Sequence, residues 1–272
     1  MVESVKCPFC ASQSFTFLQK EVEMFLCHSC QRNTTWDFAK SFQKQNHSVK
    51  KVSTKVDYST ILQRATKINN LPTEHVARQY CEGRGLPKER MDDLYFVEDF
   101  SKFLQGTEYE KKVSSTPKIV IPLRSKHGLF GVQGRTLSNE TPKYTTVKFV
   151  DCATIYGRDR VDTTKPIVVV EGPFDSMFVE NSIAVTGSGT TKIDFEGDFI
   201  YCFDNEPRNK MTVKWMSVHL MQNEKVVIWP ESIKQKDTND MVKAGIDVNK
   251  VIHENIFTGA KGTVKLHYWK KV

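Results

Sequence analysis

Residues 167–176, IVVVEGPFDS, decide the fold, because four apolar residues are followed at once by an acidic one. A short unbroken run of β-branched residues is typical of a strand that is buried on both faces of a parallel sheet. We expect further strands at 183–185, 199–203 and 225–228, and helices at 176–180, 211–220 and 238–244. This alternation predicts an α/β domain over residues 166–257, with a parallel sheet flanked by helices.

Acidic residues follow three successive strands of this domain. Glu171 and Asp175 come after the first strand, Asp204 and Glu206 after the strand at 199–203, and Asp237 lies downstream of the strand at 225–228. Ligands of such sheets bind at the carboxyl ends of the strands, so these side chains should converge. Converging carboxylates raise one another's pKa unless a cation neutralises them. Oxygen ligands without His or Cys favour magnesium or manganese, and therefore predict metal-dependent phosphoryl transfer.

Helix capping is an alternative role for several of these residues. Asp175 and Asp237 each precede a predicted helix, where a side-chain oxygen commonly accepts hydrogen bonds from free backbone amides. Glu206 with Pro207 could open the following helix in the same way. Capping does not explain why three acidic clusters recur at consecutive strand ends.

Two Cys-x-x-Cys pairs near the N-terminus, sixteen residues apart, have the spacing of a zinc ribbon. The four cysteines are Cys7, Cys10, Cys27 and Cys30. Between the pairs, 14–18 and 22–26 alternate as strands of a hairpin, which would bring the second pair opposite the first. We therefore predict a zinc ribbon at 1–42 that holds one structural Zn²⁺, with His28 on the surface.

Basic residues gather in the first part of the chain. Residues 1–165 carry 26 Lys and Arg against 18 Asp and Glu, whereas 166–272 carry 13 against 14. After a polar linker at 43–57, we expect a basic α+β subdomain at 58–165, with helices at 59–68 and 74–81 and strands at 118–123, 129–133 and around 144. Its candidate DNA- or nucleotide-binding residues are Arg124, Lys126, Arg135, Lys143, Arg158 and Arg160. A basic surface attracts phosphates, although lysines on a β surface are often only solvated.

The sequence has no apolar stretch that resembles a signal peptide or a membrane span. We therefore expect a cytoplasmic protein, in the host cytoplasm if it is viral, with no membrane partner. Seven cysteines in that compartment indicate metal ligands and reduced thiols.

The three acidic clusters, in this order, resemble the Toprim domain of bacterial-type primases, topoisomerases and some nucleases. Residues 119–137, which include Arg135, and the later Pro142-Lys143-Tyr144 resemble the basic polymerase subdomain of the primases. The segments 171–176, 204–208 and 236–241 look most like the primase subunit of T-even bacteriophages. The resemblance covers nearly the whole chain.

This resemblance implies a DNA primase, a template-directed RNA polymerase and nucleotidyltransferase that makes short RNA primers on single-stranded DNA for lagging-strand replication. Its substrates would be ribonucleoside triphosphates, and its catalytic metal Mg²⁺ or Mn²⁺. Glu171, Asp204, Glu206 and Asp237 would hold the metal, and Glu171 would also act as acid or base near the reacting hydroxyl. Arg135 and Lys143 would contact template or triphosphate. Glu206 stands where most Toprim proteins have Asp, a departure that the T-even type shares.

The sequence also bears on partners and alternatives. No Gly-x-x-x-x-Gly-Lys-Ser/Thr run occurs, so the chain carries no helicase motor, and we expect a separate hexameric helicase and possibly a single-stranded DNA-binding protein as partners. Residues 258–272 form a basic C-terminal tail, in which 265–272 are a candidate docking surface but could equally be a final strand. The competing hypotheses are a non-catalytic zinc/Toprim protein of recombination or repair, and a Toprim nuclease.

Overall fold

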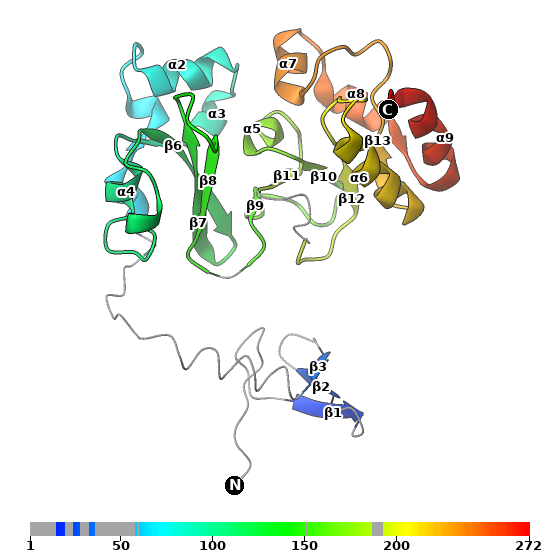
Figure 1. Ribbon diagram of the computed structural model, residues 1–272, viewed down its shortest axis with the longest axis horizontal. Helices are drawn as coiled ribbons and strands as arrows, with labels where there is room; N and C mark the ends of the chain where they lie inside the picture. Colours follow the sequence, from blue (N-terminus) through cyan, green and yellow to red (C-terminus); the bar gives the residue numbers. More distant parts are fainter. Residues whose placement is uncertain are drawn as a thin grey trace. The chain divides into compact units, whose positions relative to one another are not determined.

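The computed structural model describes residues 58, 60–150, 152–186 and 193–272, together with the backbone of three short strands near the N-terminus (Figure 1). The chain divides into two compact units, Met1–Lys55 and Val56–Val272. No helix among the described residues is long and apolar enough to cross a membrane.

The first unit contains a three-stranded antiparallel sheet of order β1-β2-β3. Its strands are β1 (Phe15–Gln19), β2 (Met24–Cys27) and β3 (Asn33–Thr35). β1 pairs with β2 in antiparallel register, which confirms the predicted hairpin. The side chains of the four predicted zinc ligands and the predicted linker at 43–57 lie outside the described residues.

The second unit begins with a five-stranded antiparallel sheet, which we call the basic subdomain. Its strands, in the order of the sheet, are β4 (Thr66–Lys67), β5 (Tyr95–Val97), β6 (Lys118–Ser125), β7 (Gly128–Thr136) and β8 (Tyr144–Lys148). Its helices are η1 (Ile61–Arg64), η2 (Ile68–Asn70), α2 (Val76–Gly83), α3 (Lys88–Met91), α4 (Phe100–Phe103) and η3 (Glu110–Lys112).

The predicted strands and the second predicted helix of this subdomain are confirmed, whereas the helix predicted at 59–68 is wrong. Two short 3₁₀ turns and strand β4 take its place. Ile61 and Ile68 are both fully buried, but they lie in different hydrophobic clusters. One helix face could not serve both clusters, so the chain turns between them.

A close approach explains Gly134 in β7. A Cβ atom at this position would lie 2.7 Å from Cδ of Lys118 and 2.9 Å from a ring carbon of Phe100. The absence of a side chain lets the Lys118 stem cross the sheet to Glu140, with 3.1 Å between Nζ and Oε2.

The rest of the second unit, which we call the α/β subdomain, is built on a six-stranded sheet of order β14-β13-β12-β10-β11-β9. The strands are β9 (Ile155–Tyr156), β10 (Ile167–Val170), β11 (Ser182–Val185), β12 (Phe199–Tyr201), β13 (Lys225–Val227) and β14 (Ile256–Phe257). The pairs β10–β11, β10–β12 and β12–β13 are parallel, which confirms the predicted parallel sheet. β9 and β14 close its two edges in antiparallel register.

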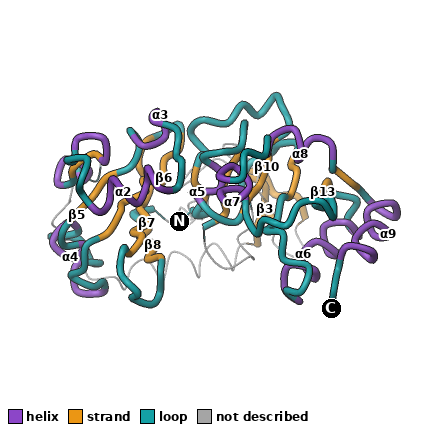
Figure 2. Tube along the Cα trace, turned by 90° about the horizontal axis from the view of Figure 1, so that it is seen from above, coloured by secondary structure: helices purple, strands orange, loops and turns teal. Residues whose placement is uncertain are grey.

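Helices cover both faces of this sheet (Figure 2). They are α5 (Pro173–Ser176), α6 (Lys210–Met221), α7 (Thr238–Lys243), α8 (Val248–Glu254) and α9 (Gly259–Trp269). Successive residues of β13 point to opposite faces of the sheet. Val227 lies in one hydrophobic cluster with residues of α5, α7 and α8, whereas Val226 lies in another with residues of α6 and α9.

One predicted helix and one predicted strand need correction. The helix predicted at 176–180 lies earlier, at α5, because Gly172 is its N-cap and Pro173 begins its first turn. The alternative of a final strand at 265–272 is wrong, since this part of the predicted tail lies in α9 as far as Trp269. Leu266, with 4% exposure, anchors α9 in the cluster beneath α6.

The basic subdomain and the α/β subdomain share one hydrophobic core. Ile119, Ile121 and Leu123 of β6 belong to the same buried cluster as Val168 and Val170 of β10. The acidic end of the parallel sheet is therefore held against the basic subdomain by packing.

Candidate active site

The carboxyl ends of the two central strands meet at Glu171 and Asp204. Glu171 follows β10 directly, and Asp204 lies three residues beyond β12. The Glu171 Oε1 atom accepts a hydrogen bond from the backbone N–H of Asp204 at 3.2 Å. The structure therefore brings together two of the acidic residues that the strand pattern singled out.

Asp175 lies inside α5, so it does not cap that helix, and Gly172 is the N-cap. Its Oδ1 atom accepts a hydrogen bond from Thr238 Oγ1 at 3.1 Å, which links α5 to α7. Burial and the charge of Asp237 raise the pKa of Asp175 to about 6, although the Thr238 hydrogen bond and the Arg84 charge act in the opposite direction.

Asp237 is the N-cap of α7, as the capping alternative predicted. Its Oδ1 atom accepts a hydrogen bond from the backbone N–H of Asp240 at 2.8 Å. The cap fixes where this carboxylate stands relative to the helix, and it involves only one of the two oxygens. Capping and a role in the acidic cluster are therefore compatible for Asp237.

Glu206 lies at the edge of the cluster and is held by two neighbours. Lys236 Nζ approaches its Oε1 at 3.0 Å, and Asn209 Nδ2 donates to its Oε2 at 3.1 Å. Burial works toward a higher pKa, but these two hydrogen bonds outweigh it and lower the pKa of Glu206. Glu206 does not cap α6, because Asn209 is the N-cap of that helix.

Asp204 has the most strongly raised pKa among the acidic residues of the cluster. Burial comes first, and the charges of Glu171 and Asp175 add to it, so that the pKa of Asp204 rises to about 8 despite Lys236. Burial also raises the pKa of Glu171. Carboxylates that resist ionisation side by side are the groups whose charge a bound cation would neutralise.

The same carboxylates do not form a finished metal cage. Within 60–150, 152–186 and 193–272, no three His, Cys, Asp or Glu side chains are arranged so that they could hold a metal ion. Mg²⁺ is usually bound through one or two carboxylates, waters and substrate phosphates rather than by an all-protein cage. The oxygen donors present here fit that mode of binding.

A cluster of arginine and tyrosine side chains faces α5 and α7 from the basic subdomain. Arg135 of β7 donates from Nε to Tyr80 Oη at 3.2 Å and lies over the Tyr144 ring at 4.8 Å. Arg84, at the end of α2, donates to the same Tyr80 oxygen at 2.9 Å. The Arg84 guanidinium lies over the ring of Phe174 in α5, 4.9 Å from its centroid.

The other predicted basic residues do not join this cluster. Arg124 is ion-paired with Asp93 at 3.2 Å, and Arg158 with Asp194 at 2.6 Å. Lys126 and Arg158 line a separate pocket of about 450 Å³ near the β6–β7 turn. Arg160 reaches Ser176 Oγ at 3.2 Å.

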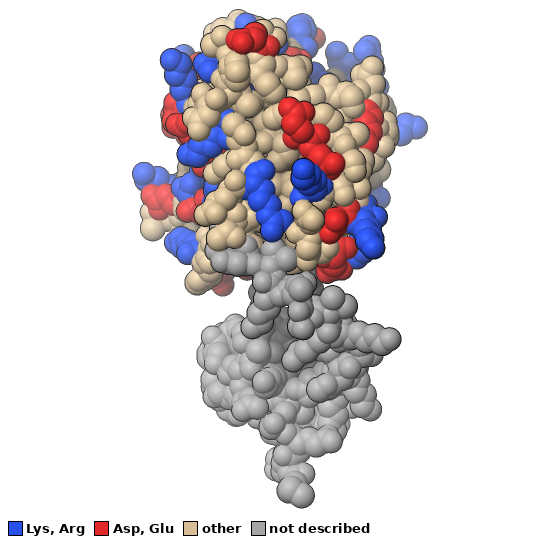
Figure 3. All heavy atoms as spheres, turned by 90° about the vertical axis from the view of Figure 1, so that its left-hand side faces the viewer, with Lys and Arg blue, Asp and Glu red and all other residues tan. Residues whose placement is uncertain are grey.

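Lys143 is exposed, as part of the loop before β8. On the face shown in Figure 3, basic and acidic side chains are interspersed around a wide uncharged area. That face therefore carries no single continuous basic patch.

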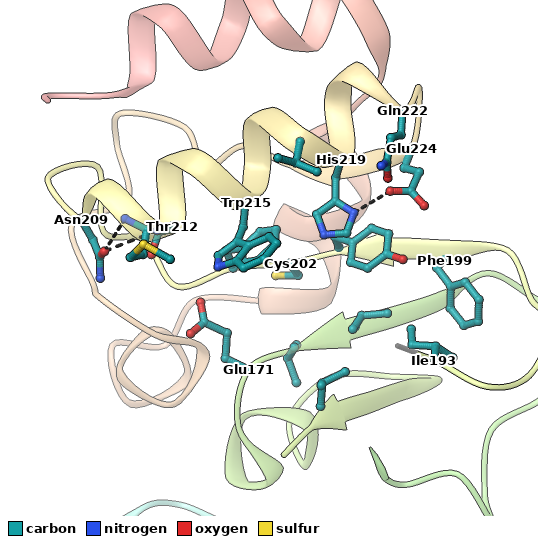
Figure 4. A pocket seen from close by; sticks show the side chains of 17 residues that line it. Glu171, Ile193, Phe199, Cys202, Asn209, Thr212, Trp215, His219, Gln222 and Glu224 are labelled. Atoms are coloured by element: carbon teal, nitrogen blue, oxygen red, sulfur yellow. Dashed lines mark hydrogen bonds and ion pairs between the residues drawn. The ribbon is translucent and has the colours of Figure 1, made fainter. Parts of the chain in front are cut away.

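A pocket of about 670 Å³ lies between α6 and the parallel sheet, with Glu171 at one end (Figure 4). Aromatic side chains line much of it, and the rings of Tyr201 and His219 stack with 3.7 Å between centroids. His219 Nδ1 and Glu224 Oε2 are 2.5 Å apart at the far end. The sequence pattern did not predict this pocket, because its lining comes from strand ends and one helix face that alternation alone does not align.

Arg84 is a further residue of the arginine and tyrosine cluster for which the sequence predicts no role. A single arginine that precedes Gly85, a residue with φ of +73°, carries only the signal of a helix end. Its neighbours across the subdomain boundary are visible only in the folded chain.

The fold of the chain, a helix-flanked α/β sheet joined to an antiparallel sheet, is similar to that of solved primase catalytic cores. The primase of Aquifex aeolicus, solved as its zinc-binding and RNA polymerase domains, superposes with a TM-score of 0.55 at 16% identity, covering 94% of this chain and 80% of that one. The RNA polymerase domain of the Mycobacterium tuberculosis primase, solved with a double-stranded DNA oligomer that has a 6-nucleotide overhang, gives 0.54 at 18% identity, covering 78% of each chain. At these identities the likeness concerns the fold.

Sequence similarity points to one branch of these proteins. The chain is 32% identical over 220 residues to the DNA primase of Enterobacteria phage T4, which is 76% of this chain and 64% of the phage protein. The chain thus spans less than two thirds of that relative's length. No family model matches it. The predicted resemblance to the T-even-type phage primase subunit is confirmed.

Proposed function

We propose that this protein is a DNA primase, which synthesises short RNA primers on single-stranded DNA by metal-dependent nucleotidyl transfer. The observation that carries the proposal is the 32% identity to the phage T4 DNA primase over 220 residues. The convergence of Glu171 and Asp204 at the carboxyl edge of the parallel sheet supports it, because phosphoryl transfer needs positioned groups and divalent cations rather than covalent chemistry from the protein.

Under this proposal, residues 166–257 form a Toprim catalytic domain, residues 58–165 the basic polymerase subdomain and residues 258–272 the C-terminal tail. Glu171, Asp204, Glu206 and Asp237 would hold Mg²⁺ or Mn²⁺, which would neutralise phosphate charge when bound. Asp175 would keep its place beside them through Thr238. The burial and the neighbouring negative charges that together raise the pKa of Asp204 support a cation at this position.

On the substrate side, Arg135 and Lys143 would contact the template strand or the triphosphate. Arg135 has no carboxylate within 4.0 Å of its guanidinium among the described residues, and its direct partners are tyrosines, so no ion pair within the chain competes for this role. Arg124 and Arg158 are ion-paired. Together with Lys126 and Arg160, they would contact nucleic acid farther from the reacting phosphate.

The N-terminal unit would be a zinc ribbon that binds one Zn²⁺ through Cys7, Cys10, Cys27 and Cys30 and helps to select the start site. The pairing of β1 with β2, which ends at Cys27 in the second cysteine pair, supports this assignment. A separate hexameric helicase and a single-stranded DNA-binding protein are the proposed partners, because a primer is useful only beside unwound DNA.

Incubation with single-stranded DNA, labelled ribonucleotides and Mg²⁺ tests the activity. Labelled oligoribonucleotides support a primase, DNA fragments indicate a nuclease, and neither product indicates a DNA-binding module. The variant D204N should lose at least about 100-fold in primer synthesis, because an amide neither carries the charge nor binds Mg²⁺ as a carboxylate does. DNA binding by D204N should remain largely intact, and retained synthesis would contradict the metal assignment.

A further inference from the structure

Besides the shared hydrophobic core, one buried amide, that of Asn239, forms hydrogen bonds across the boundary between the two subdomains of the second unit. Asn239 is the second residue of α7 and is only 4% exposed. Its Nδ2 atom donates to the backbone carbonyl of Arg84 at 2.5 Å, and its Oδ1 atom accepts from Arg84 Nη1 at 3.2 Å. One side chain therefore binds both the main chain and the side chain of a residue 155 positions away.

An amide supplies both the donor and the acceptor that these two bonds need. A carboxylate offers acceptors alone, so an aspartate at 239 would bind the guanidinium but would place an oxygen against the Arg84 carbonyl. An alanine would leave the partly buried carbonyl of Arg84 without this donor. The amide at 239 thus matches the contact across the boundary.

Arg84 is itself held firmly within the basic subdomain. Its guanidinium lies over the Tyr80 ring at 5.1 Å and donates to the Tyr80 hydroxyl, which also accepts from Arg135. The contact of Asn239 with Arg84 therefore reaches Arg135 of β7 through one shared oxygen atom.

On the other side of the contact, the first turn of α7 holds two acidic residues of the site, one as its N-cap and one through a hydrogen bond. Asp237 caps α7 two residues earlier, and Thr238, the neighbour of Asn239, donates to the Asp175 carboxylate at 3.1 Å. If the first turn of α7 moves, Asp237 and the partner of Asp175 must move with it.

We propose that Arg84 and Asn239 form a joint that fixes the basic subdomain against the first turn of α7. Both are positioning residues: they act through Asp237 and Asp175 on one side and through Arg135 on the other. Asn239 is in this respect a structural amide and not a metal ligand. The kinetic consequences rest on the proposed primase function, whereas the joint itself can be tested without any activity.

Hydrogen exchange of the full chain, followed by mass spectrometry, tests the joint directly. In N239A, amides of 237–244 should exchange about tenfold faster than in the wild type, because the first turn of α7 loses its anchor. N249A is the matched control: Asn249 bridges α8 to the segment after α5, with Oδ1 accepting from Glu180 N at 2.9 Å, and does not touch the basic subdomain. Equal exchange of 237–244 in N239A and the wild type would overturn the proposal.

The variant R84K serves as a control for general unfolding, since it keeps the positive charge and the backbone carbonyl that Asn239 binds. We expect R84K to fold like the wild type, to accelerate exchange at 237–244 by less than N239A, and to leave exchange elsewhere in the α/β subdomain unchanged. Wild-type exchange at 237–244 together with wild-type primer synthesis in R84K would show that the guanidinium contact has no positioning role.

Primer synthesis by N239D separates positioning from metal binding. If Asn239 positions α7, kcat should fall about tenfold while KM for ribonucleotides changes less than about twofold, and the Mg²⁺ concentration for half-maximal rate should not fall. R84K/N239D should lose no more than the worse single variant, because the two residues act as one unit. A lower Mg²⁺ requirement in N239D, or multiplied losses in the double variant, would overturn the joint. A wild type that makes no primers would instead refute the proposed function and leave the exchange result to judge the joint.

Discussion

Asp204 is an acidic residue whose burial and negatively charged neighbours disfavour its ionised form in the metal-free protein. It is surrounded by the charges of Glu171, Asp175 and Asp237, and Lys236 offsets them only in part. The folded chain retains a proton on Asp204 up to a pH of about 8, whereas the unfolded chain releases it near pH 4. Between these limits the folded state binds more protons than the unfolded state.

This difference predicts how stability depends on pH. Because stability falls with rising pH wherever the folded state binds more protons, the metal-free protein should melt at a lower temperature at pH 8.5 than at pH 6. Asp175, with a pKa of about 6, adds to the same trend at its lower end. The variant D204N should flatten the trend and be more stable at pH 8 by on the order of 1 kcal/mol. Thermal melts in a chelating buffer would measure both effects.

The exposed Asp240 in α7 provides the control for this prediction. D240N removes one negative charge from the same part of the molecule, yet it should leave the pH dependence of the melting temperature as in the wild type. If D204N and D240N changed the pH dependence equally, net charge and not the buried cluster would be the cause. Saturating Mg²⁺ should also raise the melting temperature more at pH 8.5 than at pH 6 in the wild type.

At the scale of single elements, α7 combines two tasks in its N-cap. Asp237 accepts a hydrogen bond from the Asp240 amide, and its carboxylate also adds to the field at Asp204. These tasks can be separated, because Asn caps helices about as well as Asp does but lacks the charge.

We therefore expect D237N to keep wild-type stability within about 0.5 kcal/mol while primer synthesis falls at least about 100-fold. D237A should lose activity to the same extent and also about 1 kcal/mol of stability, because the cap is lost. Urea denaturation and a priming assay would measure the two quantities. If activity followed stability across the two variants, Asp237 would act only as a cap.

The elements also show what the sequence could predict and why. Strand β10 was predicted to the residue, because the unbroken apolar run 167–170 ends at a charged residue. The helix at 59–68 was mispredicted because its apolar residues serve two separate clusters, which periodicity within one segment cannot distinguish. Local patterns are reliable where one element faces one environment.

At the scale of the whole molecule, the acidic residues could be grouped from sequence because they share one rule, the carboxyl ends of parallel strands. The joint between Arg84 and Asn239 obeys no such rule. Its partners lie 155 residues apart in different subdomains, and each alone resembles an ordinary helix-terminal residue. A single sequence carries no record of that distance, and only the fold places the amide against the carbonyl.

The division of the chain into the units Met1–Lys55 and Val56–Val272 predicts two separate unfolding transitions. A unit of about 55 residues buries little apolar surface, so its stability should depend on the proposed zinc. The second unit has a core of its own that runs from β6 to α8. In calorimetry of the full chain, removal of zinc should abolish the transition of the first unit. The transition of the second unit should shift by less than about 2 °C.

Two variants sharpen this test of the zinc ribbon. C30A should lose zinc, as measured by atomic absorption, and should behave in calorimetry like the chelated wild type, because three thiolates do not complete a structural site. H28A should retain one zinc per chain and both transitions, since the four cysteines alone fill the tetrahedron. Primer synthesis by C30A should fall because the ribbon no longer helps to select the start site, while the second unit stays folded. Zinc loss in H28A would instead place the histidine among the ligands, and an unchanged metal content in C30A would refute the ribbon.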